Sequence, residues 1–268
     1  MKLNDFVSKW VILLAILISP AVFAGSTAKQ SAHFSAEQIS AFAKDVEYYA
    51  AKQGARAFII ARVGRPASSL PKGVSYTHTA VAIYSDITLA DGAVVQGYAI
   101  HNLYQQAENS AQSELVIDYP VDFFWGAQQL KAGILIPTPQ LQQQLIELVA
   151  SGQHRKLHNP NYSVIANPFN NQFQNCTEFT LDMLNAAIYH TTESSKLKQN
   201  ALAYFKPQVI KTNPLKLMFG ALLLAEVSTA DHQRQIQTAT FSSLVTYLKR
   251  YQLSDEAIHF TSQAITVI

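Results

Sequence analysis

Residues 175–188 have the sequence NCTEFTLDMLNAAI, and the predicted fold is built outward from this stretch. Asn175 is a favoured helix N-cap, and Glu178 three positions later can hydrogen-bond back to the cap residue, as in a capping box. Apolar residues then recur at helical spacing, at Phe179, Met183, Leu184, Ala187 and Ile188. The stretch therefore predicts a helix with a buried face and with Cys176 in its first turn.

Cys176 is the only cysteine of the chain. A helix N-terminus offers free N–H donors and about half a unit of positive charge, and both favour thiolate over thiol. The negative charge of Glu178, one turn along, opposes thiolate formation. The alternative is that Cys176 is a small apolar residue packed at the helix start, because free cysteine is among the most buried residue types. The helix by itself leaves a nucleophile and a structural residue both open.

Residues 1–24 are typical of a secretory signal peptide. Lysines precede an apolar run at 10–18, and the small residues Val22 and Ala24 suit cleavage after Ala24. This run is short for a transmembrane helix, although an uncleaved anchor is the alternative. We therefore expect an exported protein, located in a bacterial periplasm. A leftover thiol in that oxidising compartment is a liability unless it is buried or used, which favours a chemical role for Cys176.

The composition indicates an ordered protein, with 14% charged and 49% hydrophobic residues. The net charge of +2 and the absence of basic runs argue against nucleic-acid binding. The histidines are scattered and the one cysteine has no partner, so we expect no metal site and no cofactor. No G-x-S-x-G sequence supports a serine hydrolase.

The chain is expected to have a flexible leader at 25–34, one α+β domain at 35–190, and a mainly helical extension at 191–268 packed on the same domain. The domain should contain helices near 35–54, 139–152 and 175–188, strands at 56–63, 77–84, 93–104, 113–119 and 133–137, a short aromatic helix or turn at 122–126, and a loop at 159–174. In the extension we expect an apolar buried helix at 214–226, a helix at 240–251, and an edge strand or tail at 255–268. Asp231 and His232 form a pair suited to catalysis or to a surface turn.

His78 lies at the start of the strand at 77–84, and it shares one face with Ala80, Ala82 and Tyr84, so that alanines are its nearest neighbours there. The small alanines leave space beside the imidazole. The neighbouring strand carries three candidates to orient that ring. Gln96 and Asn102 share one face and His101 lies on the other, so at most one set can face the site. We favour His101, because a histidine in an apolar strand needs a reason; the alternative for either histidine is a structural hydrogen bond.

Tyr76-Thr77-His78 opening an apolar strand, followed later by Asn175-Cys176-Thr177-Glu178-Phe179 opening a helix, is similar to the circularly permuted papain-like hydrolases. That superfamily includes the NlpC-type cell-wall peptidases and the lecithin:retinol acyltransferase group. The chain also resembles an uncharacterised family of exported bacterial proteins, through residues 162–184 and 101–104. The resemblance spans roughly residues 56–188 and implies an antiparallel sheet packed against helices.

The resemblance implies that Cys176 is the nucleophile, that His78 is the base, and that the backbone N–H of Cys176 helps to stabilise an oxyanion. Acyltransferase-type members have a second histidine about a dozen residues after the first, and this chain has none there. The third member of the site therefore stays open. His101 is a catalytic candidate, and Asn102, Gln96 and Asn175 are candidates for orienting the base or binding the oxyanion.

Three functions remain open. The first is a periplasmic cysteine hydrolase or acyltransferase that acts on an amide or ester bond, in a peptidoglycan peptide, another peptide or a lipid-linked substrate. The second is a papain-like protein of the cell envelope that binds a partner or ligand without turnover. The third is an envelope structural protein with a peripheral membrane contact through residues 214–226.

Overall fold

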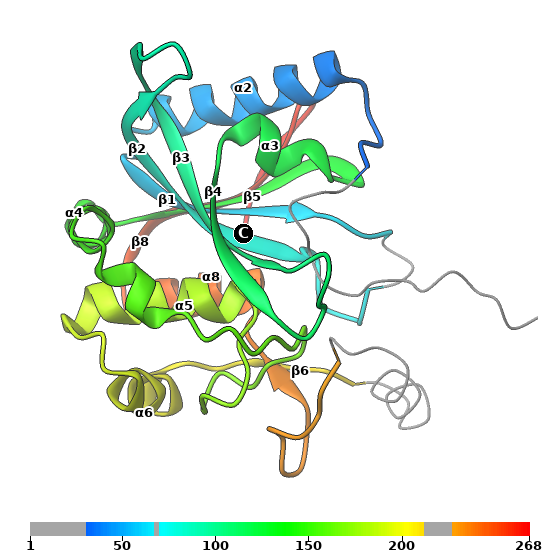
Figure 1. The fold of residues 1–268 in the computed structure, drawn as a ribbon, viewed down its shortest axis with the longest axis vertical. Coiled ribbons are helices and arrows are strands. Elements are labelled where there is room, and N and C mark those ends of the chain that lie inside the picture. Colours follow the sequence, from blue (N-terminus) through cyan, green and yellow to red (C-terminus); the bar gives the residue numbers. More distant parts are fainter. Residues whose placement is uncertain (1–30, 67–69, 212–226) are drawn as a thin grey trace, which may run out of the picture.

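A computed structural model describes residues 31–66, 70–211 and 227–268 (Figure 1). The predicted signal peptide, the first part of the leader and the apolar segment at 214–226 lie outside these residues. Within the described ranges, no helix combines the length and apolar character that crossing a membrane requires.

The centre of the molecule is a seven-stranded sheet with the order β4-β3-β2-β1-β5-β8-β9. Every neighbouring pair is antiparallel, and the sheet is open, with β4 and β9 at its edges. Its strands are β1 (Ala57–Val63), β2 (His78–Thr88), β3 (Val94–Gln105), β4 (Ser113–Asp118), β5 (Gln129–Pro137), β8 (Ser254–Thr261) and β9 (Ile265–Val267). A separate two-stranded sheet pairs β6 (Gln208–Val209) with β7 (Gln237–Thr238).

Helices cover both faces of the seven-stranded sheet (Figure 1). One face carries α2 (Ala36–Lys52) and α3 (Pro120–Trp125). The other carries α4 (Pro139–Ala150), α5 (Cys176–Tyr189), α6 (Ser194–Tyr204), α8 (Phe241–Arg250) and the 3-10 turn η2 (Gln153–Leu157). The α+β class with an antiparallel sheet packed against helices is therefore confirmed.

Two apolar cores follow from the alternation of strand residues. In β1, Ile59 and Ala61 belong to the core beneath α5 and α8, whereas Phe58 and Ile60 belong to the core beneath α2 and α3. All seven residues of β1 are buried. A strand covered on both faces has to be apolar on both faces, which explains its continuous hydrophobic sequence.

Local sequence signals explain where several elements begin and end. Ser35 caps α2 in a complete capping box with Gln38, and Gly54 follows the helix with a φ of +68°. In β5, Gly133 allows a close approach of α8, because a Cβ atom there would lie 2.6 Å from Cε1 of Phe241. The turn predicted at Asp91-Gly92 joins β2 to β3, with a φ of +86° at Gly92.

Residues 191–268 differ from the expected mainly helical extension. The segment supplies α6 and α8, but it also supplies β8 and β9 to the central sheet. Strand β8 pairs with β5, where Ile134 lies opposite Ile258, and β8 therefore lies inside the sheet. The physical reason is that β5 would otherwise present an unpaired edge, and buried side chains such as Ile258 and Phe260 fill the α2 side of the sheet.

Candidate functional site

Asn175 fixes the start of α5 and thereby the position of Cys176. Its Oδ1 accepts hydrogen bonds from the backbone N–H groups of Thr177 (3.1 Å) and Glu178 (2.9 Å). Its Nδ2 donates to the carbonyl of Val164 (3.1 Å) and to Thr238 Oγ1 (3.1 Å). Because both hydrogens of the amide are already used, Asn175 acts in this structure as a cap and anchor and has no free donor for an oxyanion.

Cys176 is 5% exposed, and its Sγ lies 3.9 Å from the carbonyl oxygen of Thr77 and 3.9 Å from Thr177 Oγ1. Burial raises the pKa of the thiol, although nearby donors and the Arg62 charge oppose the shift. The Asn175 cap leaves the N–H of Cys176 itself without an acceptor among the residues that the structure describes. This N–H is therefore available to a bound oxyanion.

His78 is fully buried at the start of β2 and held by its neighbours in β3. Its Nε2 lies 2.9 Å from Asn102 Oδ1, and its ring stacks on Tyr104 with 4.6 Å between centroids and 2° between planes. Burial, reinforced by the Arg62 charge and opposed by the Asn102 hydrogen bond, lowers the pKa of His78 to about 3. Nδ1 is buried and has no hydrogen-bond partner within the described part of the chain.

Cys176 and His78 are neighbours through the backbone, because the carbonyl beside Sγ belongs to Thr77, which precedes His78. The imidazole lies on the α3 side of the sheet, against Phe123, whereas α5 covers the opposite face. No hydrogen bond joins Nδ1 to Sγ. The imidazole therefore lies on the opposite face of the sheet from α5, and the thiol and the base are linked through the backbone at Thr77 without a hydrogen bond between them.

Asn102 connects His78 to a buried carboxyl group. Its Nδ2 donates to Asp118 Oδ2 (3.2 Å), which also accepts a hydrogen bond from the Tyr104 hydroxyl (2.6 Å). Burial raises the pKa of Asp118. These bonds fix the orientation of the Asn102 amide, so that its oxygen faces the imidazole.

Arg62 is a buried cation beside this network, and sequence reasoning missed both Arg62 and Asp118. The guanidinium is 5.7 Å from the centroid of Tyr104 and 5.3 Å from that of Phe123, and Nη1 donates to the Phe123 carbonyl. Nε and Nη2 of Arg62 have no hydrogen-bond partner among the described residues. A charged residue in the apolar run of β1 was the available signal, because such a residue is rarely buried without a function or a partner.

The other candidates for orienting the base lie elsewhere. His101 lies 5.2 Å from the ring of His154 and lines a cavity of about 370 Å³. Burial, followed by the charges of His154 and Arg155, lowers the pKa of His101 to about 4. Gln96 lies at the exposed end of β3, where it donates to Asp86 (3.2 Å). Of the three candidates, Asn102 is the one that contacts His78.

His154 and His158 are four residues apart, a spacing found in metal sites that sequence reasoning passed over. His158 Nε2 lies instead 3.0 Å from Ser113 Oγ. Among the residues that the structure describes, no group of three or more His, Cys, Asp or Glu side chains is arranged to hold a metal ion.

A cavity of about 350 Å³ opens beside Cys176. It lies between the loop at 70–77, the loop that leads into α5, and the two short strands β6 and β7. Its described lining consists of Arg65, Leu70, Pro71, Val74, Tyr76, Thr77, Tyr162, Val164, Ile165, Asn175, Cys176, Thr177, Ile210, Thr238, Ala239 and Thr240.

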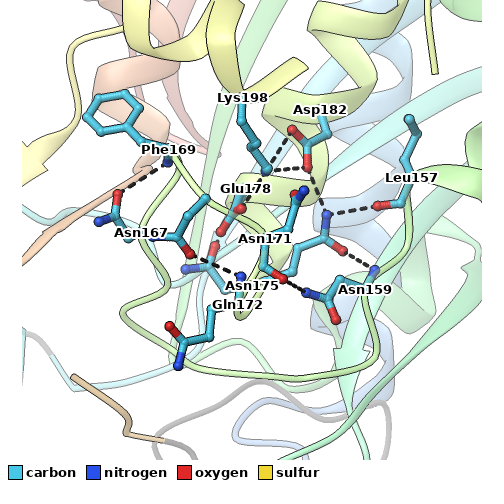
Figure 2. Close-up of polar contacts among 12 residues, drawn as sticks. Leu157, Asn159, Asn167, Phe169, Asn171, Gln172, Asn175, Glu178, Asp182 and Lys198 are labelled. Atoms are coloured by element: carbon cyan, nitrogen blue, oxygen red, sulfur yellow. Dashed lines mark hydrogen bonds and ion pairs between the residues drawn. The ribbon is translucent and has the colours of Figure 1, made fainter. Parts of the chain in front are cut away.

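Glu178 does not return a hydrogen bond to the cap residue, so the capping box predicted there is wrong. Its Oε1 instead accepts from Lys198 Nζ at 2.6 Å (Figure 2). Lys198 also binds both oxygens of Asp182, at 3.0 and 2.9 Å. Burial raises the pKa of Glu178, while the two carboxyl groups outweigh burial and raise the pKa of Lys198. Glu178 is therefore part of a buried ion cluster, because Lys198 of α6 lies beside it.

The loop before α5 is held by amide side chains (Figure 2). Gln174 Nε2 donates to Asp182 Oδ2 (2.9 Å) and to the Leu157 carbonyl (3.0 Å), and Asn159 Nδ2 donates to the Asn171 carbonyl (2.7 Å). Asp231 and His232 bind this loop as well. Asp231 Oδ2 accepts from the N–H of Asn167 (2.7 Å), and His232 Nε2 lies 2.9 Å from the Ile165 carbonyl. In this structure the pair therefore anchors the loop.

Residues 49–248 match the protein family described as "uncharacterized protein conserved in bacteria" (DUF2145). The chain belongs to this family, which confirms the expected likeness to an uncharacterised bacterial family. No curated protein and no solved structure matches the chain. The likeness to permuted papain-like hydrolases therefore rests on the sequence motifs alone, and these comparisons do not confirm it.

Proposed function

We propose that this protein is an exported, thiol-dependent hydrolase or acyltransferase that acts on an amide or ester bond, with Cys176 as nucleophile and His78 as base. The observation that carries the proposal is the hydrogen bond between His78 Nε2 and Asn102 Oδ1. This bond holds one ring nitrogen and leaves Nδ1 to take up a proton. The resemblance to permuted papain-like hydrolases supports the same roles, and the apolar start of the sequence supports export.

The proposed reaction has two steps. Sγ of Cys176 attacks the acyl carbon while its proton passes to His78 Nδ1, and the amine or alcohol leaves with that proton. The resulting thioester is then cleaved by water in a hydrolase, or by an alcohol or amine in an acyltransferase. The free N–H of Cys176 supplies one donor to the oxyanion, and loss of one such donor typically costs about 3 kcal/mol of barrier.

The pKa directions determine when the proton moves. Burial raises the pKa of Cys176 and lowers that of His78, so the resting pair is thiol and neutral imidazole. Proton transfer therefore accompanies the attack and does not precede it. Because the imidazole lies on the opposite face of the sheet from α5, the proposal requires that substrate binding rearranges the start of β2 and brings Nδ1 and Sγ into hydrogen-bond contact.

The test is acyl-enzyme formation by residues 25–268 with activated p-nitrophenyl esters, followed by intact-mass spectrometry. We expect a thioester adduct on wild type and none on Cys176→Ala. His78→Ala should slow adduct formation at least about a hundredfold. His33→Ala is the control, since His33 is an exposed histidine that contacts Gln128 and neither Cys176 nor His78. Equal ester cleavage by wild type and Cys176→Ala would contradict the proposal.

A second candidate is a non-catalytic binding protein of the cell envelope. It is favoured by the buried, protonated thiol and by the absence of a bond between Sγ and the imidazole. In that case the cavity beside Cys176 would hold a ligand, and the His78–Asn102 pair would be structural. The acyl-enzyme experiment separates the two candidates, because a non-catalytic binding protein should form no adduct, either as wild type or as any variant.

A further inference from the structure

The cavity beside Cys176 has mainly apolar walls. Leu70, Val74, Val164, Ile165 and Ile210 line it from three different segments of the chain. Its volume of about 350 Å³ falls within the usual range of small-molecule sites, roughly 300–1,000 Å³. A cavity that adjoins a nucleophile receives the part of the substrate that is attached to the attacked carbon or to the leaving group.

The charges of the lining discriminate between substrate classes. No carboxylate lines the described part of the cavity, and Arg65 is its charged residue. A peptide bearing an ammonium group would lose water there without a negative partner, which is strongly unfavourable. A hydrocarbon chain meets no such cost, and burying each methylene group improves binding by about fourfold.

The volume limits the length of the chain. A cavity of about 150 Å³ holds one benzene molecule, so a cavity of about 350 Å³ holds on the order of ten to fifteen non-hydrogen atoms. A medium-length acyl chain fills it. A long fatty chain would extend beyond it, and an acetyl group would leave most of it empty.

We propose that this cavity binds the acyl chain of the substrate, so that Cys176 acts on an ester or amide of a medium-chain aliphatic acid. The inference rests on the proposed function for the covalent step and on the cavity alone for the binding step. In the covalent step, the carbon–sulfur bond forms at the acyl carbon as the alcohol or amine departs with the thiol proton.

The first arm of the test measures turnover. With p-nitrophenyl esters, we expect kcat/KM to rise from acetyl through butanoyl to octanoyl and to gain nothing further at hexadecanoyl. Val164→Phe narrows the cavity, since Val164 lines it, and should reduce octanoyl turnover at least tenfold more than it reduces acetyl turnover. Val94→Phe, at a position 61% exposed on β3, is the matched control and should change neither.

The second arm measures binding without chemistry. Calorimetry of Cys176→Ala with unreactive methyl ketones of the same chain lengths should show the same rise to the octanoyl length. Retained chain-length dependence in binding, with no turnover by wild type, would overturn the proposed reaction and leave the occupant of the cavity established.

A binding profile that does not change with chain length overturns the inference, as does a Val164→Phe variant that lowers acetyl and octanoyl turnover equally. Ile210→Phe provides a second narrowing variant from another wall, in case Val164→Phe does not fold.

Discussion

His78 Nε2 lies 2.9 Å from Asn102 Oδ1, in the neighbouring strand. Asn102 in turn donates to Asp118, so the imidazole, the amide and the carboxyl group form one buried chain. This chain orients a histidine whose second nitrogen is free of hydrogen bonds in the described structure. The relationship identifies Asn102, and neither His101 nor Gln96, as the residue that can act through His78.

Replacing Asn102 by alanine should misplace the base. We expect Asn102→Ala to lower kcat on the order of a hundredfold. It should also reduce the free energy of unfolding by about 1–3 kcal/mol, because His78 and Asp118 lose a buried partner. Gln96→Ala is the matched control and should leave kcat unchanged, since Gln96 contacts Asp86 at the exposed end of β3. A loss of kcat in Gln96→Ala equal to that in Asn102→Ala would contradict the assignment.

Removing Lys198 should leave two buried carboxyl groups without their cation. Urea denaturation at pH 7.5 should show that Lys198→Met lowers the free energy of unfolding by about 3–5 kcal/mol. Lys196→Met is the control, because Lys196 pairs with Glu193 at the surface, with 60% and 56% of the side chains exposed. Its cost should be below about 0.5 kcal/mol. A similar loss in the free energy of unfolding for both variants would show that the buried cluster stabilises the protein no more than the surface pair does.

Adding a methyl group at Gly133 should force α8 away from the sheet. A Cβ there would lie 2.6 Å from Cε1 of Phe241, and overpacking of this kind costs about 1–3 kcal/mol. Gly97→Ala is the control, since its Cβ would meet only the flexible end of Ile87 at 3.1 Å. Adding Phe241→Leu to Gly133→Ala should cost less than the sum of the single changes. Strict additivity in thermal unfolding would rule out the contact as the cause.

His101 should make the protein less stable as the pH falls. Its pKa is lowered to about 4 in the folded state, so the unfolded chain takes up the proton first. The stability it contributes is complete above about pH 6.5 and is lost progressively down to about pH 4, by up to about 1.4 kcal/mol per pH unit.

Urea midpoints of wild type and His101→Gln at pH 7 and 5 isolate this effect, because Glu178, whose raised pKa acts in the opposite direction, is present in both proteins. Between those two pH values, wild type should lose up to about 2 kcal/mol more than His101→Gln. A parallel pH dependence of wild type and His101→Gln would show that His101 titrates normally.

The thiol of Cys176 should alkylate slowly at neutral pH. Burial raises its pKa, so the midpoint for iodoacetamide should lie above the ordinary value of about 8.5. The urea-unfolded protein serves as the control and should titrate at that ordinary value. A folded midpoint below about 7 would instead show a preformed thiolate–imidazolium pair.

The sequence by itself determined the local structure. Ser35 and Gln38 fixed the start of α2, Asp91-Gly92 fixed the turn between β2 and β3, and Asn175 fixed the first turn of α5. These features rest on bonds between residues a few positions apart, so a single segment contains all the information they need. The class of fold followed from their order.

Only the tertiary structure decided how these elements meet. Strand parity separated His101 from Asn102 but did not reveal which of the two faces His78, because that depends on how β3 lies beside β2. Glu178 fitted a capping box locally, yet Lys198, twenty positions along the chain, binds it instead. The reason is burial, because a carboxyl group inside a protein is stabilised far more by a cation than by a backbone N–H at a helix end. The sequence therefore named Cys176, His78 and Asn102 as candidates, missed Arg62 and Asp118, and did not reveal which side chains pair with one another.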